Sequence, residues 1–230
     1  GNESYTGTVY VFEVPVRVWH WIHALAITVL AISGYFIANP LPSVSGEASD
    51  SFLMGNIRLI HFIAAMVFAV GLFVRFYWAI VGNKYAKGLV VVPVWRIEFW
   101  KRLWHEVLMY SFLTRKVAKY RGHNPLAQLA MWIFNVALAL FMVCTGFALY
   151  SQGTGAGSWA DTLFGWVFVI EPSSQAVRMW HLLGMWLMVF LVNIHIYMVI
   201  RAEFMSRENG ISVLIDGIRR FMDDGPRDPQ

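Results

Sequence analysis

Residues 178–201 read RMWHLLGMWLMVFLVNIHIYMVIR, and this stretch decides the fold of the chain. Between Arg178 and Arg201 lie 22 residues without a formal charge. At about 1.5 Å per residue, a helix of this length extends roughly 33 Å, which is enough to cross the hydrocarbon core of a bilayer. The stretch therefore predicts a membrane-spanning helix.

Two histidines interrupt this apolar stretch. His181 and His195 are fourteen residues apart, close to four helical turns, so their side chains lie on nearly one face, about 21 Å apart along the axis. A buried imidazole in hydrocarbon is costly and needs a partner. Two imidazoles on one face at two depths suggest two stacked cofactors, and haem iron is the usual partner at such a site.

The composition supports a membrane protein. The chain has 230 residues, of which 58% are hydrophobic and only 14% are charged, against about 25% in a soluble domain. The single cysteine, Cys144, lies in an apolar run, and no C-x-x-C-H motif occurs. Covalently attached c-type haem and iron–sulfur clusters are therefore excluded, so any haem is a b-type haem held by histidine. We expect a lipid bilayer around the chain and no nucleic-acid partner.

Three further apolar runs predict membrane spans. Together with the first they give a single all-α domain over residues 1–230, an integral membrane four-helix bundle with its cofactors in the core. Residues 94–113 (VWRIEFWKRLWHEVLMYSFL) alternate charges and aromatics at helical spacing. This pattern predicts an amphipathic helix that lies in the membrane interface between the second and third spans. The predicted spans are about 17–38, 58–81, 124–150 and 178–201.

The loop charges predict the orientation of the chain. Residues 82–122 carry nine Lys and Arg, whereas residues 39–57 and 151–177 carry two acidic residues each and no Lys or Arg. Basic loops stay in the cytoplasm. We therefore expect a multi-pass membrane protein with both termini in the cytoplasm and the two acidic loops on the other side.

Two more histidines complete a set of four. His20 opens the first span at cytoplasmic depth, and His61 opens the second span at the outer depth. Matching depths pair His20 with His195 around one haem and His61 with His181 around another. The alternative is four interfacial or core histidines that bind no metal, although ionisable residues in membrane helices are usually functional. His23, three residues after His20, competes with it as a ligand, but it would set its haem deeper.

Several other residues fit around two haems. Residues three positions apart share a helix face, so an arginine three residues before a ligand can reach a haem propionate, or simply extend to the interface. Gly34 follows His20 by fourteen residues and would leave room for porphyrin at the outer haem. Arg75 follows His61 by fourteen residues and would offset charge at the cytoplasmic haem. Gly146 and Gly184 offer either clearance or close helix packing. The three arginines before ligands are Arg17, Arg58 and Arg178.

The start of the third span offers polar groups at cytoplasmic depth. His123, Asn124 and Gln128 are candidates to bind a quinone carbonyl. The alternative for Asn124 is helix capping, with Pro125 in the first helical position. Both roles are compatible with the sequence.

Several segments resemble the cytochrome b subunit of membrane-bound [NiFe] uptake hydrogenases. The resemblance extends over about residues 9–215. The histidine frame alone is shared with the cytochrome b subunits of respiratory formate dehydrogenases, whereas the loop and GHNP segments indicate the hydrogenase branch. The segments are VFEVPVRVWHW (11–21), PLPSVSGEAS (40–49), RLIHF (58–62), VPVWR (92–96), GHNPLAQLAM (122–131), TGFALY (145–150) and WHLLGMW (180–186), followed by His195-Ile196-Tyr197.

The resemblance implies a function and a set of partners. Such subunits anchor a periplasmic hydrogenase, made of a large [NiFe] subunit and a small iron–sulfur subunit, in a hetero-oligomer. They pass electrons through two b haems to the quinone pool and perform no hydrogen chemistry themselves. The family's ligand positions map onto the four paired histidines and do not require His23. Three alternatives remain for the function of the chain. It could be the cytochrome of a formate dehydrogenase or thiosulfate reductase, a purely structural anchor, or a histidine-containing proton channel without haem.

Overall fold

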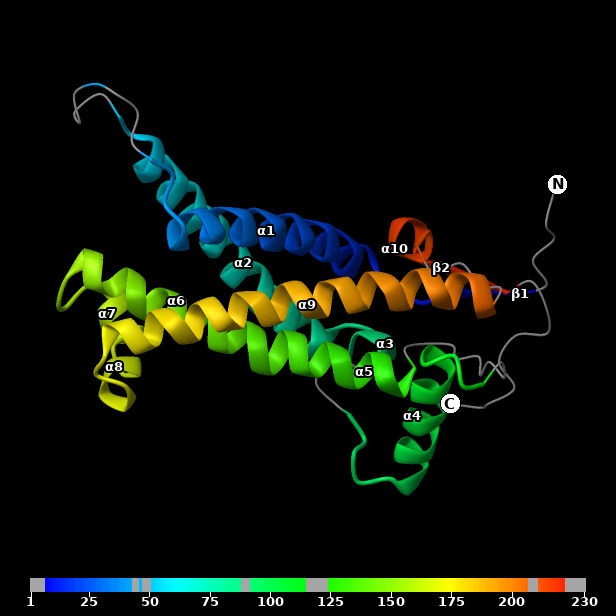
Figure 1. Ribbon diagram of the computed structural model, residues 1–230. Coiled ribbons are helices and arrows are strands. Elements are labelled where there is room, and N and C mark those ends of the chain that lie inside the picture. The colour runs from blue at the N-terminus through cyan, green and yellow to red at the C-terminus, as the bar shows by residue number, and fades with distance from the viewer. Residues whose placement is uncertain are drawn as a thin grey trace. The chain divides into compact units, whose positions relative to one another are not determined.

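The computed structural model describes residues 7–42, 46, 51–87, 92–114, 124–206 and 211–221. Within them four helical runs are long and apolar enough to cross a membrane (Figure 1). The third run is continuous through α5 (Pro125–Trp132), a π-helical segment (Ile133–Leu138) and α6 (Ala139–Thr154). The predicted all-α membrane fold with four spanning helices is confirmed. The other three runs are α1 (Val14–Ala38), α2 (Leu53–Val81) and α9 (Ser174–Ser206).

Most of the apolar surface of these helices faces outward. Only 17% of the most apolar window of α1 and 22% of that of α2 is buried within the protein. Leu25 on α1 and Ile80 on α2 are 66% and 73% exposed, respectively. A helix that is apolar all round in this way matches a lipid environment, where its outer face is solvated by acyl chains.

Shorter elements connect and flank the spans. The expected amphipathic segment contains a 14-residue helix, α4, in which Phe99, Glu106 and Met109 are buried while Trp100 and Trp104 are exposed. Its position in the membrane interface remains a prediction. The short elements are β1 (Gly7–Tyr10), α3 (Lys84–Lys87), α4 (Ile97–Tyr110), α7 (Trp159–Phe164), α8 (Val167–Ile170), α10 (Val213–Asp216) and β2 (Ile218–Phe221).

The chain divides into two compact units, each containing sections of several helices. The first unit comprises residues 1–21, 74–136 and 191–230, and the second comprises residues 22–73 and 137–190. That the whole chain is one domain remains a prediction.

The two ends of the described chain meet within the first unit. Strands β1 and β2 pair antiparallel, with Gly7 opposite Phe221 and Tyr10 opposite Ile218 (Figure 1). The carboxylate of Glu13 accepts hydrogen bonds from the Trp78 indole N–H (3.0 Å) and the Asn83 backbone N–H (2.9 Å). These contacts tie the start of α1 to the end of α2. The apolar side chains beneath them are Val11, Phe12, Val16, Ala86 and Val213.

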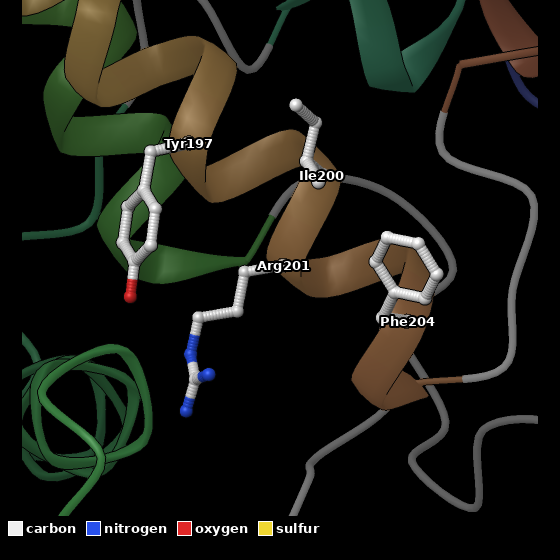
Figure 2. Close-up of a pocket in the computed structure, with 4 residues that line it drawn as sticks. All are labelled: Tyr197, Ile200, Arg201 and Phe204. Atoms are coloured by element: carbon white, nitrogen blue, oxygen red, sulfur yellow. The ribbon is translucent and has the colours of Figure 1, made fainter.

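Helix α4 is attached to the end of α9 in the first unit. The Tyr197 hydroxyl donates to the carbonyl of Tyr110 (2.9 Å), and Arg201 Nη2 donates to the carbonyl of Met109 (2.8 Å). Both acceptors belong to the last turn of α4, where carbonyls lack intrahelical partners. The Arg201 guanidinium also lies 3.7 Å from the centre of the Phe112 ring. Tyr197 and Arg201, together with Ile200 and Phe204, line a largely apolar hollow beside these contacts (Figure 2).

The second unit closes around α6. Helices α7 and α8 pack against α6 (Figure 1). Ala148 and Val177 are fully buried beside Val167. Ser158 caps α7 by accepting a hydrogen bond from the Asp161 backbone N–H. This packing holds the ends of α6 and α9 together next to the second pair of histidines.

Candidate cofactor sites

The first histidine pair, His20 and His195, lies in the first unit. The centres of the two imidazole rings are 6.4 Å apart, and the ring planes are inclined by 52°. At this separation both rings can coordinate a single metal atom placed between them. His20 Nδ1 is buried and has no hydrogen-bond partner among the described residues.

Arg75 lies in the same unit as the first pair. Its side chain is only 4% exposed, and its guanidinium is 5.6 Å from the centre of the Trp19 ring. Nη2 donates to the Ala86 carbonyl (3.1 Å), whereas Nη1 is buried without a hydrogen-bond partner among the described residues. A buried cation is costly unless an anion or acceptor accompanies it. The unused donor fits a site that takes up an anionic group such as a haem propionate.

The second histidine pair, His61 and His181, lies in the second unit. Each ring nitrogen Nδ1 contacts a hydroxyl group on a neighbouring helix. The distance is 2.9 Å from His61 Nδ1 to Ser33 Oγ on α1, and 2.8 Å from His181 Nδ1 to Thr145 Oγ1 on α6. Neither hydroxyl was predicted from the sequence, although Ser33 directly precedes Gly34 and Thr145 directly precedes Gly146.

Those two glycines allow the histidine rings to approach the helix backbones closely. A Cβ atom at Gly34 would lie 3.3 Å from His61 Cε1 and 3.4 Å from Met185 Sδ. A Cβ atom at Gly146 would lie 3.0 Å from His181 Cε1. The space at Gly34 thus admits the imidazole of His61, and room for porphyrin there remains a prediction.

The donor set of the two pairs fits haem b. Each pair supplies two imidazoles from two different helices and no thiolate, and bis-histidine ligation of this kind is one of the known ways to hold haem iron. Among the described residues no three His, Cys, Asp or Glu side chains gather into a common site. The residues present therefore suit a cofactor that needs only two axial ligands from the protein.

His23 belongs to the second unit. It is 5% exposed, and its ring stacks on Phe68 in the second unit with ring centres 4.4 Å apart. His20, not His23, therefore faces His195. His105 lies on α4 with its side chain 36% exposed, 3.8 Å from a carboxylate oxygen of Glu106.

The three arginines that precede proposed ligands have different surroundings. Arg17 donates from Nη1 to the backbone carbonyl of Ile215, so at least one of its donors serves the C-terminal segment. Arg58 and Arg178 are exposed on α2 and α9. Contact with propionates remains a prediction for all three.

The candidate quinone residues are only partly described. His123 lies outside the described residues. Asn124 caps α5 by accepting a hydrogen bond at Oδ1 from the Ala127 backbone N–H (2.6 Å), which confirms the capping prediction. Gln128 is half-buried one turn further on. Neither residue's role towards quinone is tested by these contacts.

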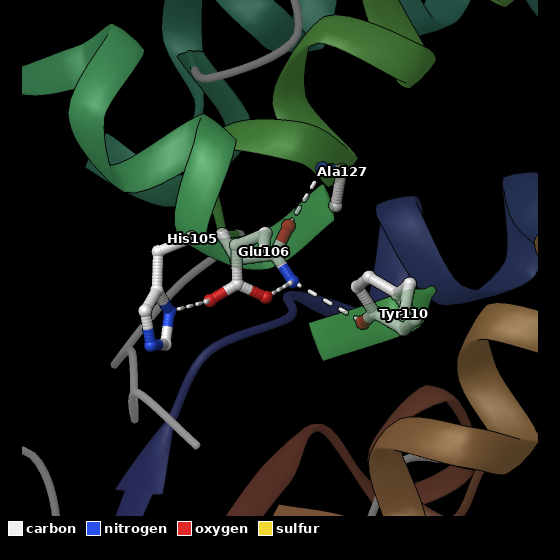
Figure 3. Close-up of polar contacts among 5 residues, drawn as sticks. His105, Glu106, Tyr110 and Ala127 are labelled. Atoms are coloured by element: carbon white, nitrogen blue, oxygen red, sulfur yellow. Dashed lines mark hydrogen bonds and ion pairs between the residues drawn. The ribbon is translucent and has the colours of Figure 1, made fainter. Parts of the chain in front are cut away.

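Asn124 also connects α5 to α4. Its Nδ2 group lies 3.3 Å from Glu106 Oε2 and 3.4 Å from the Tyr110 hydroxyl, and Figure 3 shows Glu106 between His105 and Tyr110. Glu106 is 1% exposed, which is unusual for a carboxylate. In the sequence, Glu106 is one charge among several on a predicted amphipathic helix. The spacing of charges along α4 does not indicate that the face carrying Glu106 packs against the third span.

The fold and the histidine pairs define a membrane-spanning b-type cytochrome. The sequence profile of the prokaryotic cytochrome b561 family matches residues 11–217, so the chain belongs to that family. The chain is 54% identical over 218 residues to the probable Ni/Fe-hydrogenase B-type cytochrome subunit of Azotobacter chroococcum mcd 1, covering 95% of this chain and 91% of that protein.

Other relatives give the same result. The subunit with the same name from Rhizobium leguminosarum bv. viciae is 53% identical over 216 residues, covering 94% of this chain and 90% of that protein. The probable Ni/Fe-hydrogenase 1 B-type cytochrome subunit of Escherichia coli (strain K12) is 46% identical, covering 91% of this chain and 90% of that protein. The resemblance found in the sequence is confirmed.

Proposed function

We propose that this chain is a di-haem cytochrome b that anchors a [NiFe] hydrogenase to the bacterial inner membrane and delivers its electrons to quinone. The observation that carries the proposal is the presence of two separate histidine pairs in a chain with four spanning helices. The choice of a hydrogenase as partner is supported by the names of the relatives, which are hydrogenase subunits.

Each pair of histidines holds one haem b. His20 and His195 would hold the first haem, and Arg75 would supply a buried cation for its propionates. His61 and His181 provide the ligands of the second, with Arg58 and Arg178 near the membrane surface for its propionates. When bound, each haem supplies a one-electron couple within the low-dielectric interior of the membrane.

Quinone binds beside the first pair. In the proposal His123, Asn124 and Gln128 hold a carbonyl oxygen of the ring, and the chain takes up protons from the cytoplasm for its reduction. The polar contacts from Asn124 to Glu106 and Tyr110 support this position for quinone. They show that hydrogen-bond donors and acceptors gather at the start of the third span.

The orientation of the chain in the membrane defines the direction of electron transfer. The nine basic residues of 82–122 support a cytoplasmic position for that segment and for both termini. The acidic loops 39–57 and 151–177 then face the periplasm, where the small iron–sulfur subunit of the hydrogenase docks. Electrons enter at the second pair and leave at the first, while hydrogen itself is oxidised in the large [NiFe] subunit.

The first prediction concerns haem content. The complex, extracted with detergent from membranes, should contain two b haems per chain by pyridine haemochrome assay. Replacing His61 or His181 by Ala should remove one haem, and replacing His20 or His195 should remove the other, because each loses an axial ligand. His23→Ala is the matched control and should retain both.

The outcomes separate the alternatives. Full haem content after His181→Ala, or wild-type complex without a Soret band, would exclude the cytochrome and favour a proton channel. Two haems with molybdenum in place of nickel in the purified complex would assign the chain to a formate dehydrogenase or thiosulfate reductase. Quinone reduction that continues without either haem would reduce the role of the haems to assembly.

A further inference from the structure

Two hydroxyl groups contact the histidines of the second pair in the same manner. Ser33 on α1 reaches His61 Nδ1 at 2.9 Å, and Thr145 on α6 reaches His181 Nδ1 at 2.8 Å. The side chain of Ser33 is 6% exposed and that of Thr145 is 3% exposed. Each hydroxyl residue directly precedes the glycine against which its histidine packs, Gly34 for His61 and Gly146 for His181. The same combination of hydroxyl, glycine and histidine therefore occurs twice in the second unit.

The direction of these hydrogen bonds follows from counting hydrogen atoms. A hydroxyl group has one hydrogen to donate and two lone pairs. Ser33 donates its hydrogen to the Val29 carbonyl (2.6 Å), and Thr145 donates to the Phe141 carbonyl (2.8 Å), each one turn earlier in its helix. The hydroxyl oxygens are therefore acceptors towards the imidazoles, and His61 and His181 carry their hydrogen on Nδ1.

We propose that Ser33 and Thr145 are positioning residues that hold His61 and His181 as Nδ1–H tautomers, so that each Nε2 lone pair is available to haem iron. The inference rests on the proposed function, since it assumes a haem at the second pair. A ligand histidine commonly donates its other N–H to a neighbouring group, which orients the ring and increases its basicity. The first pair differs, because His20 Nδ1 has no such partner among the described residues.

The hydrogen bonds have an electronic consequence. An acceptor on Nδ1–H makes the imidazole a stronger donor to iron and thereby favours Fe(III) over Fe(II). A neutral hydrogen bond contributes about 0.5–1.5 kcal/mol, which corresponds to about a two- to tenfold change in the Fe(III)/Fe(II) ratio at a given potential. The two hydroxyls thus lower the reduction potential of the second haem while leaving that of the first unchanged.

The test uses three variants and two matched controls in the complete complex. Thr145→Val and Ser33→Ala remove the hydroxyls, whereas Thr145→Ser keeps the hydroxyl and removes only a methyl group. Thr28→Val and Ser151→Ala remove hydroxyls on the same two helices that bond to backbone carbonyls and have no histidine partner in the structure. The readouts are redox titration of both haems and low-temperature EPR of the oxidised complex.

The expected result is a change at one haem only. Thr145→Val should lower the Fe(III)/Fe(II) ratio of the second haem about two- to tenfold and alter its EPR signal. Thr145→Ser and both controls should behave as wild type. Ser33→Ala should have a smaller effect, since the Leu30 carbonyl is close enough to His61 to accept in place of the hydroxyl.

Two results would overturn the inference. The first is a Thr145→Val complex with both haems, both titration waves and both EPR signals unchanged. The second is loss of the second haem from Thr145→Ser as well as from Thr145→Val, because packing of the methyl group would then be responsible. Loss from Thr145→Val alone supports the inference. A wild-type complex without haem at His61 and His181 would instead refute the proposed function.

Discussion

The imidazole rings of the second pair lie directly against helix backbone, and glycine makes this possible. A Cβ atom at residue 146 would lie 3.0 Å from His181 Cε1, closer than nearly all contacts of real Cβ atoms, while one at residue 34 would lie 3.3 Å from His61 Cε1. An added methyl group must therefore displace an imidazole that is also bonded to a hydroxyl. The glycines and hydroxyls together define where each ring lies.

Replacement of Gly146 by Ala should reduce occupancy of the second haem, and more strongly than Gly34→Ala, since its contact is the shorter one. Overpacking of this kind costs about 1–3 kcal/mol, so we expect about a tenfold loss of haem affinity for Gly146→Ala. Pyridine haemochrome assay on the purified complex measures it. Gly153→Ala is the control on the same helix, because no atom lies within 4 Å of its Cβ position. Equal haem content in all three variants would contradict the close approach.

At the scale of elements, α4 and α5 are linked through one side chain. Asn124 caps α5 with its oxygen and meets Glu106 and Tyr110 of α4 with its nitrogen. The cap was predictable, because Asn before Pro is a frequent start of a helix. The contact with α4 was not, since residues 115–123 intervene and no local pattern specifies how α4 returns to the third span.

Variants of Asn124 separate these two roles. Asn124→Ala should destabilise the start of α5 by about 1 kcal/mol, the usual cost of losing a cap. Asn124→Ser should keep the cap and lose the contact with Glu106, so the KM for quinone should rise while the Ala127 amide remains protected. Hydrogen exchange and quinol formation measure the two effects. Ser158→Ala, which removes the cap of α7, should leave the KM for quinone unchanged. If the KM rises equally in Ser158→Ala and Asn124→Ser, the cause is a general loss of stability rather than the contact with Glu106.

For the whole molecule, the two histidine pairs differ in the buried groups around them. The second pair is surrounded by hydroxyl acceptors, which favour Fe(III), whereas the first pair shares its unit with the buried cation of Arg75, which favours Fe(II). In the proposed di-haem protein, both effects would give the second haem the lower potential. Electrons that enter at the second pair would then move downhill to the first.

Arg75→Gln should lower the potential of the first haem and narrow the difference between the two. A unit charge about 10 Å away contributes about 1.7 kcal/mol at an effective dielectric constant of 20, which is roughly a tenfold change in the Fe(III)/Fe(II) ratio. Gln retains a donor for the Ala86 carbonyl, and Arg75→Lys retains the charge and should stay close to wild type. Redox titration checks both variants. If the reduction potential of the first haem is unchanged in Arg75→Gln, the Arg75 cation is too far from that haem to affect its potential.

The sequence by itself determined the spanning helices, the family and the cap at Asn124. These features depend on composition, on periodicity along a single helix and on local backbone chemistry, all of which are short-range. Only the tertiary structure decided that Ser33 and Thr145 contact the ligand rings, that Gly34 accommodates an imidazole, that His23 stacks on Phe68, and that Glu106 is buried. Each of these depends on which faces of two helices meet. A helix that is apolar all round carries no amphipathic signal from which that choice can be read.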